Sequence, residues 1–120
     1  MLSNYKELKV WQKAYQLCLQ IYKMTRVFPK EEQYNLTSQI RRAAVSIPSN
    51  IAEGYGRNTT PNYIRSLHIA YGSICEFETQ TLLAGDLEYL PAESVQNARE
   101  HIQEVERMLK ALIASLERKL

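Results

Sequence analysis

The feature that most constrains the fold of this chain is the regular spacing of apolar residues toward its C-terminal end. The predicted helix begins at Pro91, with Glu93 in its first turn, where the helix dipole favours an anion. Apolar residues at alternating steps of three and four form one stripe along an α-helix, whereas a half-buried strand alternates with a period of two. The stripe consists of Val95, Ala98, Ile102, Val105, Leu109, Leu112 and Leu116.

A first helix is predicted by the same spacing near the N-terminus. It ends at Phe28-Pro29, because the residue before a proline is pushed out of helical geometry. Two stripes run side by side, one of Leu8, Trp11, Tyr15, Cys18 and Tyr22, the other of Val10, Ala14, Leu17, Ile21 and Met24. Together they make an apolar face wider than one bundle seam requires, so we expect this helix to contact another subunit.

A second helix is predicted to begin near Tyr34. Pro48 lies inside it, has no N–H for the carbonyl of Ala44 and crowds that carbonyl, so we expect a kink or break around residues 44–48. Gly54 and Gly56 predict the end of the helix, where a left-handed residue favours glycine. The apolar face of this helix consists of Leu36, Ile40, Ala43, Ile47 and Ile51.

A third helix is predicted from Thr60 as N-cap and Pro61 at the first helical position, ending near Leu87 after Gly85. Its apolar positions are Ile64, Leu67, Tyr71, Ile74, Phe77, Leu82 and Leu83. Short connections place consecutive helices antiparallel to one another. We therefore predict an all-α protein, an antiparallel up-down-up-down four-helix bundle, with one domain over residues 1–120 and the second helix kinked near Pro48.

Composition agrees with a soluble globular protein. The 120 residues are 45% apolar and 23% charged, and only 4 glycines and 4 prolines argue against a turn-rich sandwich or barrel. No apolar run is long enough to span a membrane, and the first residues lack the layout of a signal peptide, so we expect a cytoplasmic protein without a membrane partner. Cys18 and Cys75 lie among apolar residues and are predicted to be small buried hydrophobic side chains.

Charge is distributed unevenly along the chain. Residues 1–66 hold ten Lys or Arg and four Asp or Glu, whereas residues 67–120 hold five and nine, giving +6 and −4. Two interpretations fit the arginines of the basic half: Arg41 or Arg42 pairs with Glu76 or Glu78, or the arginines form a face that binds anions. The arginines in question are Arg41, Arg42, Arg57 and Arg65.

Tyrosines lie between and beside these arginines, and their rings are suited to stacking on unpaired bases. The candidate nucleic-acid-binding residues are Arg41, Arg57, Arg65, Tyr55 and Tyr63. An isoelectric point of 8.5 gives this hypothesis only weak support, because committed nucleic-acid binders usually exceed about 9. Glu78 falls close to the seam of the third helix, so we expect an ion pair there that fixes register.

No pattern of catalytic residues is present. Di-iron bundles need paired Glu-x-x-His motifs, but Arg65 stands three residues before His68 and Ala98 three before His101. The sequence also lacks a nucleophile elbow, a P-loop and a dinucleotide-binding glycine motif. We expect no enzymatic activity, no metal, no cofactor and no small-molecule substrate.

The run from Gln39 to Arg57, with Ser-Ile-Pro-Ser-Asn-Ile-Ala-Glu-Gly at its centre, closely resembles the signature of the 23S rRNA intervening-sequence proteins, a bacterial four-helix-bundle family. Flanking segments agree, and the resemblance covers nearly the whole chain. It implies a homopentamer and a polar network at the family's signature positions. These are Gln39, Arg42, Asn50, Glu53 and Gly54, with the downstream acidic position at Glu76 or Glu78.

The chain is also similar to the accessory variability protein of diversity-generating retroelements, a resemblance that implies a basic surface for nucleic acid and for an RNA-binding protein. Two hypotheses remain open. The first is an oligomeric adaptor that binds structured RNA or single-stranded nucleic acid. The second is a structural or protein-interaction bundle without a nucleic-acid role. Arginines free of intramolecular carboxylates favour the first hypothesis.

Overall fold

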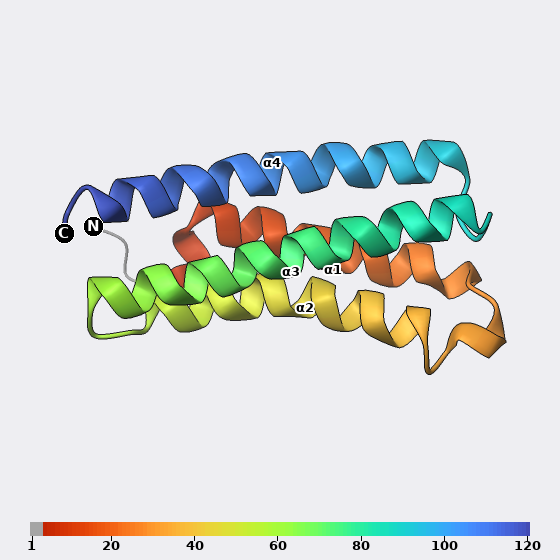
Figure 1. Cartoon of the computed structure of the whole chain (residues 1–120), viewed down its shortest axis with the longest axis horizontal. Coiled ribbons are helices and arrows are strands. Elements are labelled where there is room, and N and C mark those ends of the chain that lie inside the picture. Colours follow the sequence, from red (N-terminus) through yellow and green to blue (C-terminus); the bar gives the residue numbers. More distant parts are fainter. Residues whose placement is uncertain (1–3) are drawn as a thin grey trace.

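A computed structural model describes residues 4–120. The four long helices are α1 (Lys9–Met24), α2 (Leu36–Tyr55), α3 (Thr60–Asp86) and α4 (Ala92–Glu117), and no strand occurs among the described residues. They form an elongated antiparallel bundle of 46 × 24 × 21 Å (Figure 1). Three short 3₁₀ helices, Tyr5–Glu7, Thr25–Val27 and Lys30–Glu32, lie before α1 and between α1 and α2. The predicted four-helix bundle is confirmed.

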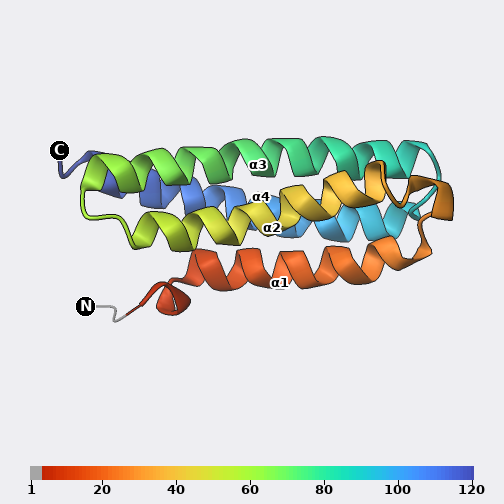
Figure 2. The same cartoon turned by 90° about the horizontal axis from the view of Figure 1, so that it is seen from below.

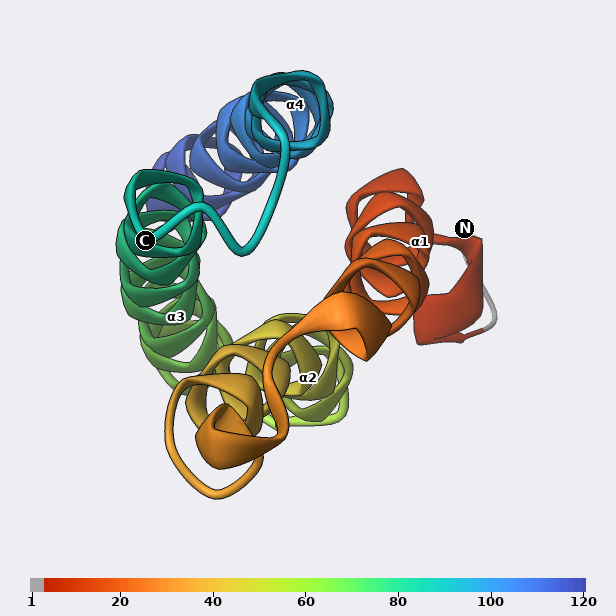
Figure 3. The same cartoon turned by 90° about the vertical axis from the view of Figure 1, so that its right-hand side faces the viewer.

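Each helix packs against the next one in the chain, and α4 also contacts α1, which closes the bundle. The side and end views show the four helices running alongside one another around a common core (Figures 2 and 3). All five predicted apolar residues of α2 are buried, as are Ala98, Ile102 and Val105 of α4. The helical spacing in the sequence therefore identified the residues that hold these helices together.

The two apolar stripes of α1 differ in exposure. Val10, Ala14, Leu17 and Ile21 are buried in the core. In the other stripe Tyr15 is 48% exposed and Tyr22 39% exposed. One stripe thus accounts for packing within the bundle, and the second leaves aromatic surface facing outward.

Helix α2 passes through Pro48 without interruption and ends at Tyr55. A kink or break was expected around residues 44–48, with Pro48 not ending the helix: there is no break, the helix continues past Pro48 as predicted, and Pro48 is buried inside it. The expected left-handed end is wrong: Gly56, the C-cap, has a φ of −80°, and no glycine among residues 4–120 has a positive φ. Gly54 lies within the helix, where it is needed for close packing instead. A Cβ atom there would lie 2.8 Å from Cβ of Ser66 on α3.

Several helix boundaries differ slightly from the prediction, and α4 begins at Ala92 with Pro91 as its N-cap. The N-cap of α3 is Thr59, whose hydroxyl accepts a hydrogen bond from the N–H of Asn62, so the expected cap at Thr60 is off by one residue. Helix α1 ends at Met24, and the turn of 3₁₀ helix after it carries the chain to Phe28. There the hydroxyl of Thr25 donates to the carbonyl of Ile21, 2.8 Å away, so a side chain binds one of the last carbonyls of α1.

The two cysteines lie in different surroundings. Cys18 is half-buried on α1, and burial raises the pKa of its thiol. Cys75 is exposed on α3, so the prediction that it is a buried hydrophobic side chain is wrong. The buried face of α3 passes through Ile74 and Phe77. Cys75 lies between these residues in sequence but on the outer side of the helix, next to the exposed Glu76.

Candidate nucleic-acid interface

A hollow of about 290 Å³ lies where α2 turns back into α3. Both helices contribute to it, since the chain reverses direction within a few residues after Tyr55. The residues that line it are Glu53, Arg57, Asn62, Arg65, Ser66 and Ile69. Arg57 and Arg65, two of the predicted nucleic-acid-binding residues, are thus brought to one site.

The close approach of the two helices forms the base of this hollow. Gly54 offers no side chain, and Ser66 opposite it is buried, so the backbones come together beneath the arginines. The N–H of Gly56 donates to the carbonyls of Ala52 and Glu53, which ends α2, and the Thr59 cap begins α3. Small residues and a short connection therefore hold the two arginines at the same end of the bundle.

The charges at the hollow are only partly neutralised. Arg57 forms an ion pair with Glu53, one helical turn earlier, and both side chains are about half exposed. Arg65 is exposed and has no ion-pair partner among the described residues. The site therefore carries an excess of positive charge, because Arg65 is not neutralised by any carboxylate of the described residues.

Tyr55 and Tyr63 lie next to the hollow and contact each other. Their ring centroids are 6.1 Å apart with the rings nearly perpendicular, at 86°. Tyr63 also packs over Gly54, and burial together with Tyr55 raises the pKa of Tyr63 to about 12. Both rings are half-buried, so they serve first as packing between α2 and α3.

Arg41 is remote from this hollow. It lies near the start of α2, about 21 Å along the helix axis from the last helical residue, Tyr55, and Arg57 follows beyond that end. Its guanidinium stacks over the ring of Tyr22, 4.7 Å from the centroid, and its Nε donates to the hydroxyl of Thr25 at 2.8 Å. The structure therefore separates the predicted basic residues into two sites at opposite ends of α2.

The signature polar residues make mainly local contacts. The amide of Asn50 donates to the carbonyl and hydroxyl of Ser46 at 2.8 and 2.9 Å, and the hydroxyl of Ser46 contacts that of Ser73 on α3 at 2.8 Å. Glu53 pairs with Arg57, as described above. Among the described residues no side-chain hydrogen bond or ion pair joins the exposed Gln39, Arg42 or Glu76 to another residue.

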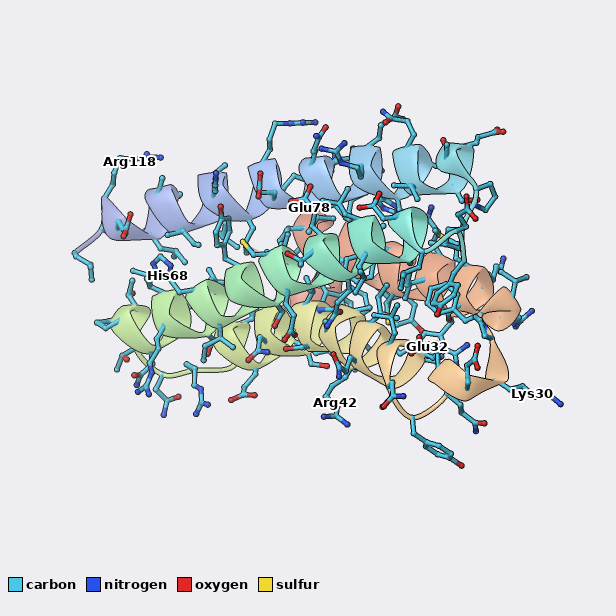
Figure 4. All side chains as sticks on the ribbon, turned by 45° about the vertical axis from the view of Figure 1, so that its right-hand side comes forward. Lys30, Glu32, Arg42, His68, Glu78 and Arg118 are labelled. Carbon is cyan, nitrogen blue, oxygen red and sulfur yellow. The ribbon has the colours of Figure 1, made fainter. Side chains whose placement is uncertain are left out.

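The expected pairing of Arg41 or Arg42 with Glu76 or Glu78 is wrong. Glu78 lies 3.9 Å from Nε of Arg99 on α4 instead, and Figure 4 shows Arg42 pointing away from the bundle. Glu78 therefore faces α4, whereas Arg42 lies on the outer side of α2. The position of Glu78 near the seam of α3 predicted an ion pair there. The structure has such a pair, but the partner lies on α4 and not on α2.

Sequence reasoning missed three residues around Arg41: Tyr22, Thr25 and Tyr34. Tyr22 had been placed in the apolar stripe of the first helix. Thr25 and Tyr34 lie in the connection, where no periodicity indicates which side chains meet. A signal did exist, because antiparallel neighbours bring the end of α1 beside the start of α2.

Other chemistry is sparse in the part of the chain that the structure covers. No cluster of three or more His, Cys, Asp or Glu side chains able to hold a metal ion occurs in residues 4–120. Within the same range, none of the helices is long and apolar enough to cross a membrane. His68 is exposed, and His101 is half-buried with Nδ1 2.8 Å from the amide oxygen of Gln20.

Comparison with a solved structure supports the fold, and a family model identifies the family. A similar solved structure is that of a protein of unknown function from the S23 ribosomal protein family of Bacteroides thetaiotaomicron. It has 24% identity and a TM-score of 0.81, over 88% of this chain and 95% of that chain. No curated protein sequence matches. The model of the 23S rRNA-intervening sequence proteins matches residues 6–111. This match covers most of the sequence, and the chain therefore belongs to the 23S rRNA-intervening sequence protein family.

Proposed function

We propose that this chain is a non-enzymatic, oligomeric adaptor of the cytoplasm that binds nucleic acid through the hollow at the α2–α3 turn. Its ligand is structured RNA or single-stranded nucleic acid, alone or together with an RNA-binding protein. Arg57 and Arg65 contact phosphates, because the planar fork of arginine meets phosphate oxygens with two hydrogen bonds.

The observation that carries this proposal is that most arginines in the basic half of the chain lack a carboxylate partner. Of the four arginines in the basic half, only Arg57 forms an ion pair with a carboxylate of the described residues, whereas Arg41, Arg42 and Arg65 do not. Internal neutralisation was the main alternative to an anion-binding face. Arginines held at a surface without a counter-charge favour ligands that carry phosphate.

Binding by one subunit is expected to be weak. The second half of the chain is acidic, and Glu53 competes for Arg57, so a single subunit has an affinity near the non-specific range, with a Kd of about 10⁻⁴ to 10⁻⁶ M. An oligomer presents several copies of the hollow to one strand. Linked contacts raise the overall affinity without any new contact.

The outward stripe of α1 supports an oligomer. Trp11 stacks on Tyr15 with ring centroids 5.0 Å apart, and Tyr5 meets Trp11 edge-on at 5.3 Å. Beside these rings lies a hollow of about 310 Å³ that includes Val45 and Pro48 of α2. Aromatic surface of this kind is typical of protein interfaces, and we propose a second copy of the chain as its partner, within a pentamer as the family resemblance implies.

The same aromatic surface favours the second candidate function, a protein-interaction bundle without nucleic acid. The two candidates make different predictions for the arginines. In an interaction bundle, Arg57 and Arg65 contribute only to solubility and to a surface ion pair. Replacing them then leaves the binding of the partner protein unchanged.

Fluorescence anisotropy with a labelled single-stranded RNA tests the proposal. We expect binding at 50 mM salt that weakens at 200 mM, because phosphate contacts release counterions. The variant Arg57→Gln/Arg65→Gln should bind more weakly than wild type. The variant Arg107→Gln/Arg118→Gln removes the same charge from an exposed position of α4 and from its C-cap, and it should bind nearly as well. Absence of binding at low salt by wild type would favour the interaction bundle.

A further inference from the structure

A second hollow, of about 410 Å³, lies at the other end of α2, where this helix begins. None of its lining residues is acidic, and two are arginines. The lining residues are Tyr22, Gln33, Tyr34, Thr37, Ser38, Arg41 and Arg42. This site, which we call the Arg41 hollow, lies at the end of the bundle opposite the α2–α3 turn.

Arg41 is held in place without a carboxylate. Its Nε donates to the Thr25 hydroxyl at 2.8 Å, one Nη donates to the carbonyl of Tyr22 at 3.4 Å, and its guanidinium lies over the Tyr22 ring. The positive charge is therefore fixed in orientation, and its other N–H groups have no protein acceptor among the described residues. Arg42, the next residue, points away from the bundle and adds a second cation (Figure 4).

The first turn of α2 adds unpaired donors. The Leu36 N–H donates to the carboxylate of Glu32 at 3.3 Å, and the Gln39 N–H donates to the carbonyl of Asn35. The N–H groups of Thr37 and Ser38 have no acceptor in the described part of the chain. Such groups, together with the positive end of the helix dipole, bind anions.

Thr37 provides an independent observation. Its side chain is only 8% exposed, lines the hollow and carries a buried hydroxyl without a hydrogen-bond partner among residues 4–120. A buried hydroxyl without a partner is unfavourable, and buried polar groups in native structures are nearly always paired. A phosphate oxygen at the helix start would supply the missing acceptor once a small rotation of the Thr37 side chain brings its hydroxyl to the surface of the hollow.

An aromatic ring stands at the mouth of the hollow. Tyr34 is 85% exposed, the largest exposure among the large apolar and aromatic side chains of the described residues. A ring in this position gives a base a flat surface on which to stack, and stacking accepts any base. Gln33 beside it carries an amide that can both donate and accept hydrogen bonds.

We propose that the Arg41 hollow is a nucleotide-binding site, with the phosphate against the first turn of α2 and the two arginines and the base stacked on Tyr34. A nucleotide within a nucleic-acid strand is one source of such a ligand. If the ligand comes from a strand, the inference rests on the proposed function. A free mononucleotide is the other source. Glu32 lies in the 3₁₀ turn before α2, and its carboxylate is engaged by the Leu36 N–H and by the hydroxyl of Tyr89 at 2.7 Å.

The first arm of the test uses adenosine 5′-monophosphate, with adenosine and inorganic phosphate as partial ligands, in calorimetric titrations of the full chain. We expect the mononucleotide to bind more tightly than either fragment. Tyr34→Ala should weaken it by about 5- to 150-fold, the range expected for loss of one stacked base. Arg42→Gln and the nearly isosteric Thr37→Val should each weaken the binding of the mononucleotide and of phosphate. Arg118→Gln is the matched control and should leave both affinities unchanged.

The second arm uses the labelled single-stranded RNA. One outcome is that RNA binding is weakened both in Tyr34→Ala/Arg42→Gln and in Arg57→Gln/Arg65→Gln. This would show that one strand uses both ends of α2 and would support the inference. Another outcome is that only Arg57→Gln/Arg65→Gln weakens RNA binding, while the Tyr34 and Arg42 variants bind the mononucleotide as tightly as wild type does. In that case the inference is overturned and the proposed function stands. If wild type binds the mononucleotide but no strand, the site is for free nucleotides and the proposed function fails.

Discussion

Gly54 of α2 and Ser66 of α3 approach so closely that a Cβ atom on the glycine would lie 2.8 Å from the Cβ of the serine. The side chain of Tyr63 lies on the same spot, 3.0 Å away. Neither neighbour is the far end of a flexible side chain, so the two helices must separate to admit a methyl group. This contact lies beside the hollow of Arg57 and Arg65, which Ser66 also lines.

Gly54→Ala should therefore lower the free energy of unfolding by about 1–2 kcal/mol, because overpacking outweighs the gain in helix propensity. Gly72→Ala is the matched control. Nothing lies within 4 Å of a Cβ at that position on α3, so it should stabilise the protein by about 0.5–1 kcal/mol. Urea denaturation measures both, and an equal gain in the two variants would contradict the close contact.

Pro48→Ala should raise the free energy of unfolding. Proline inside a helix costs up to about 3 kcal/mol relative to alanine, and α2 is continuous on both sides of residue 48. The gain is reduced by the loss of the buried ring beside Trp11 and Tyr15. Thermal denaturation measures the change, with Ser49→Ala as control, and a large loss of stability would show that the ring's packing outweighs the missing hydrogen bond.

Stability should fall as the pH is lowered through the range in which His101 takes up a proton. Burial, the largest effect, lowers the pKa of His101 from its usual 6.5. The charge of Glu104 raises this pKa, the charge of Lys13 lowers it, and a hydrogen bond with the backbone of Lys13 raises it. The folded state thus binds the proton less readily than the unfolded state, so this contribution is complete above pH 6.5 and is lost as the pH falls toward the folded-state pKa.

Urea midpoints at pH 7.5 and 5.5 check this for wild type, His101→Gln and the exposed control His68→Gln. The drop between the two pH values should be smaller in His101→Gln than in wild type. It should be unchanged in His68→Gln. An identical drop in all three proteins would show that other groups cause the pH dependence.

The buried faces of the helices could be predicted from the sequence because burial follows the helical period. Ile40, Ile47 and Ile51 are all buried as expected. The local boundary at Thr59 was misplaced by one residue, since two adjacent threonines compete for the cap and only the geometry of the turn decides. The separation of Arg41 from Arg57 was also missed, because the rise of about 1.5 Å per residue along α2 carries Arg57, just beyond the end of that helix, to the opposite end of the bundle.

An oligomer is expected from the outward stripe of α1. Light scattering at micromolar concentration should give a mass several times 13.9 kDa, five times for a pentamer. Tyr15→Lys should reduce the mass, because a charge on the exposed ring position disfavours burial against a second copy. Gln103→Lys on the exposed side of α4 is the control. A monomer mass for wild type would contradict the proposed assembly.

The most direct measurement of nucleic-acid binding is the salt dependence of the affinity for single-stranded RNA, compared between wild type and Arg57→Gln/Arg65→Gln. Each lost phosphate contact lowers the slope of log affinity against log salt by about 0.7 for a single strand. Binding through the hollow predicts a slope lower by about 1.4 in the double variant, with the slope of Arg107→Gln/Arg118→Gln unchanged. Equal slopes in all three proteins would contradict a phosphate contact at Arg57 and Arg65.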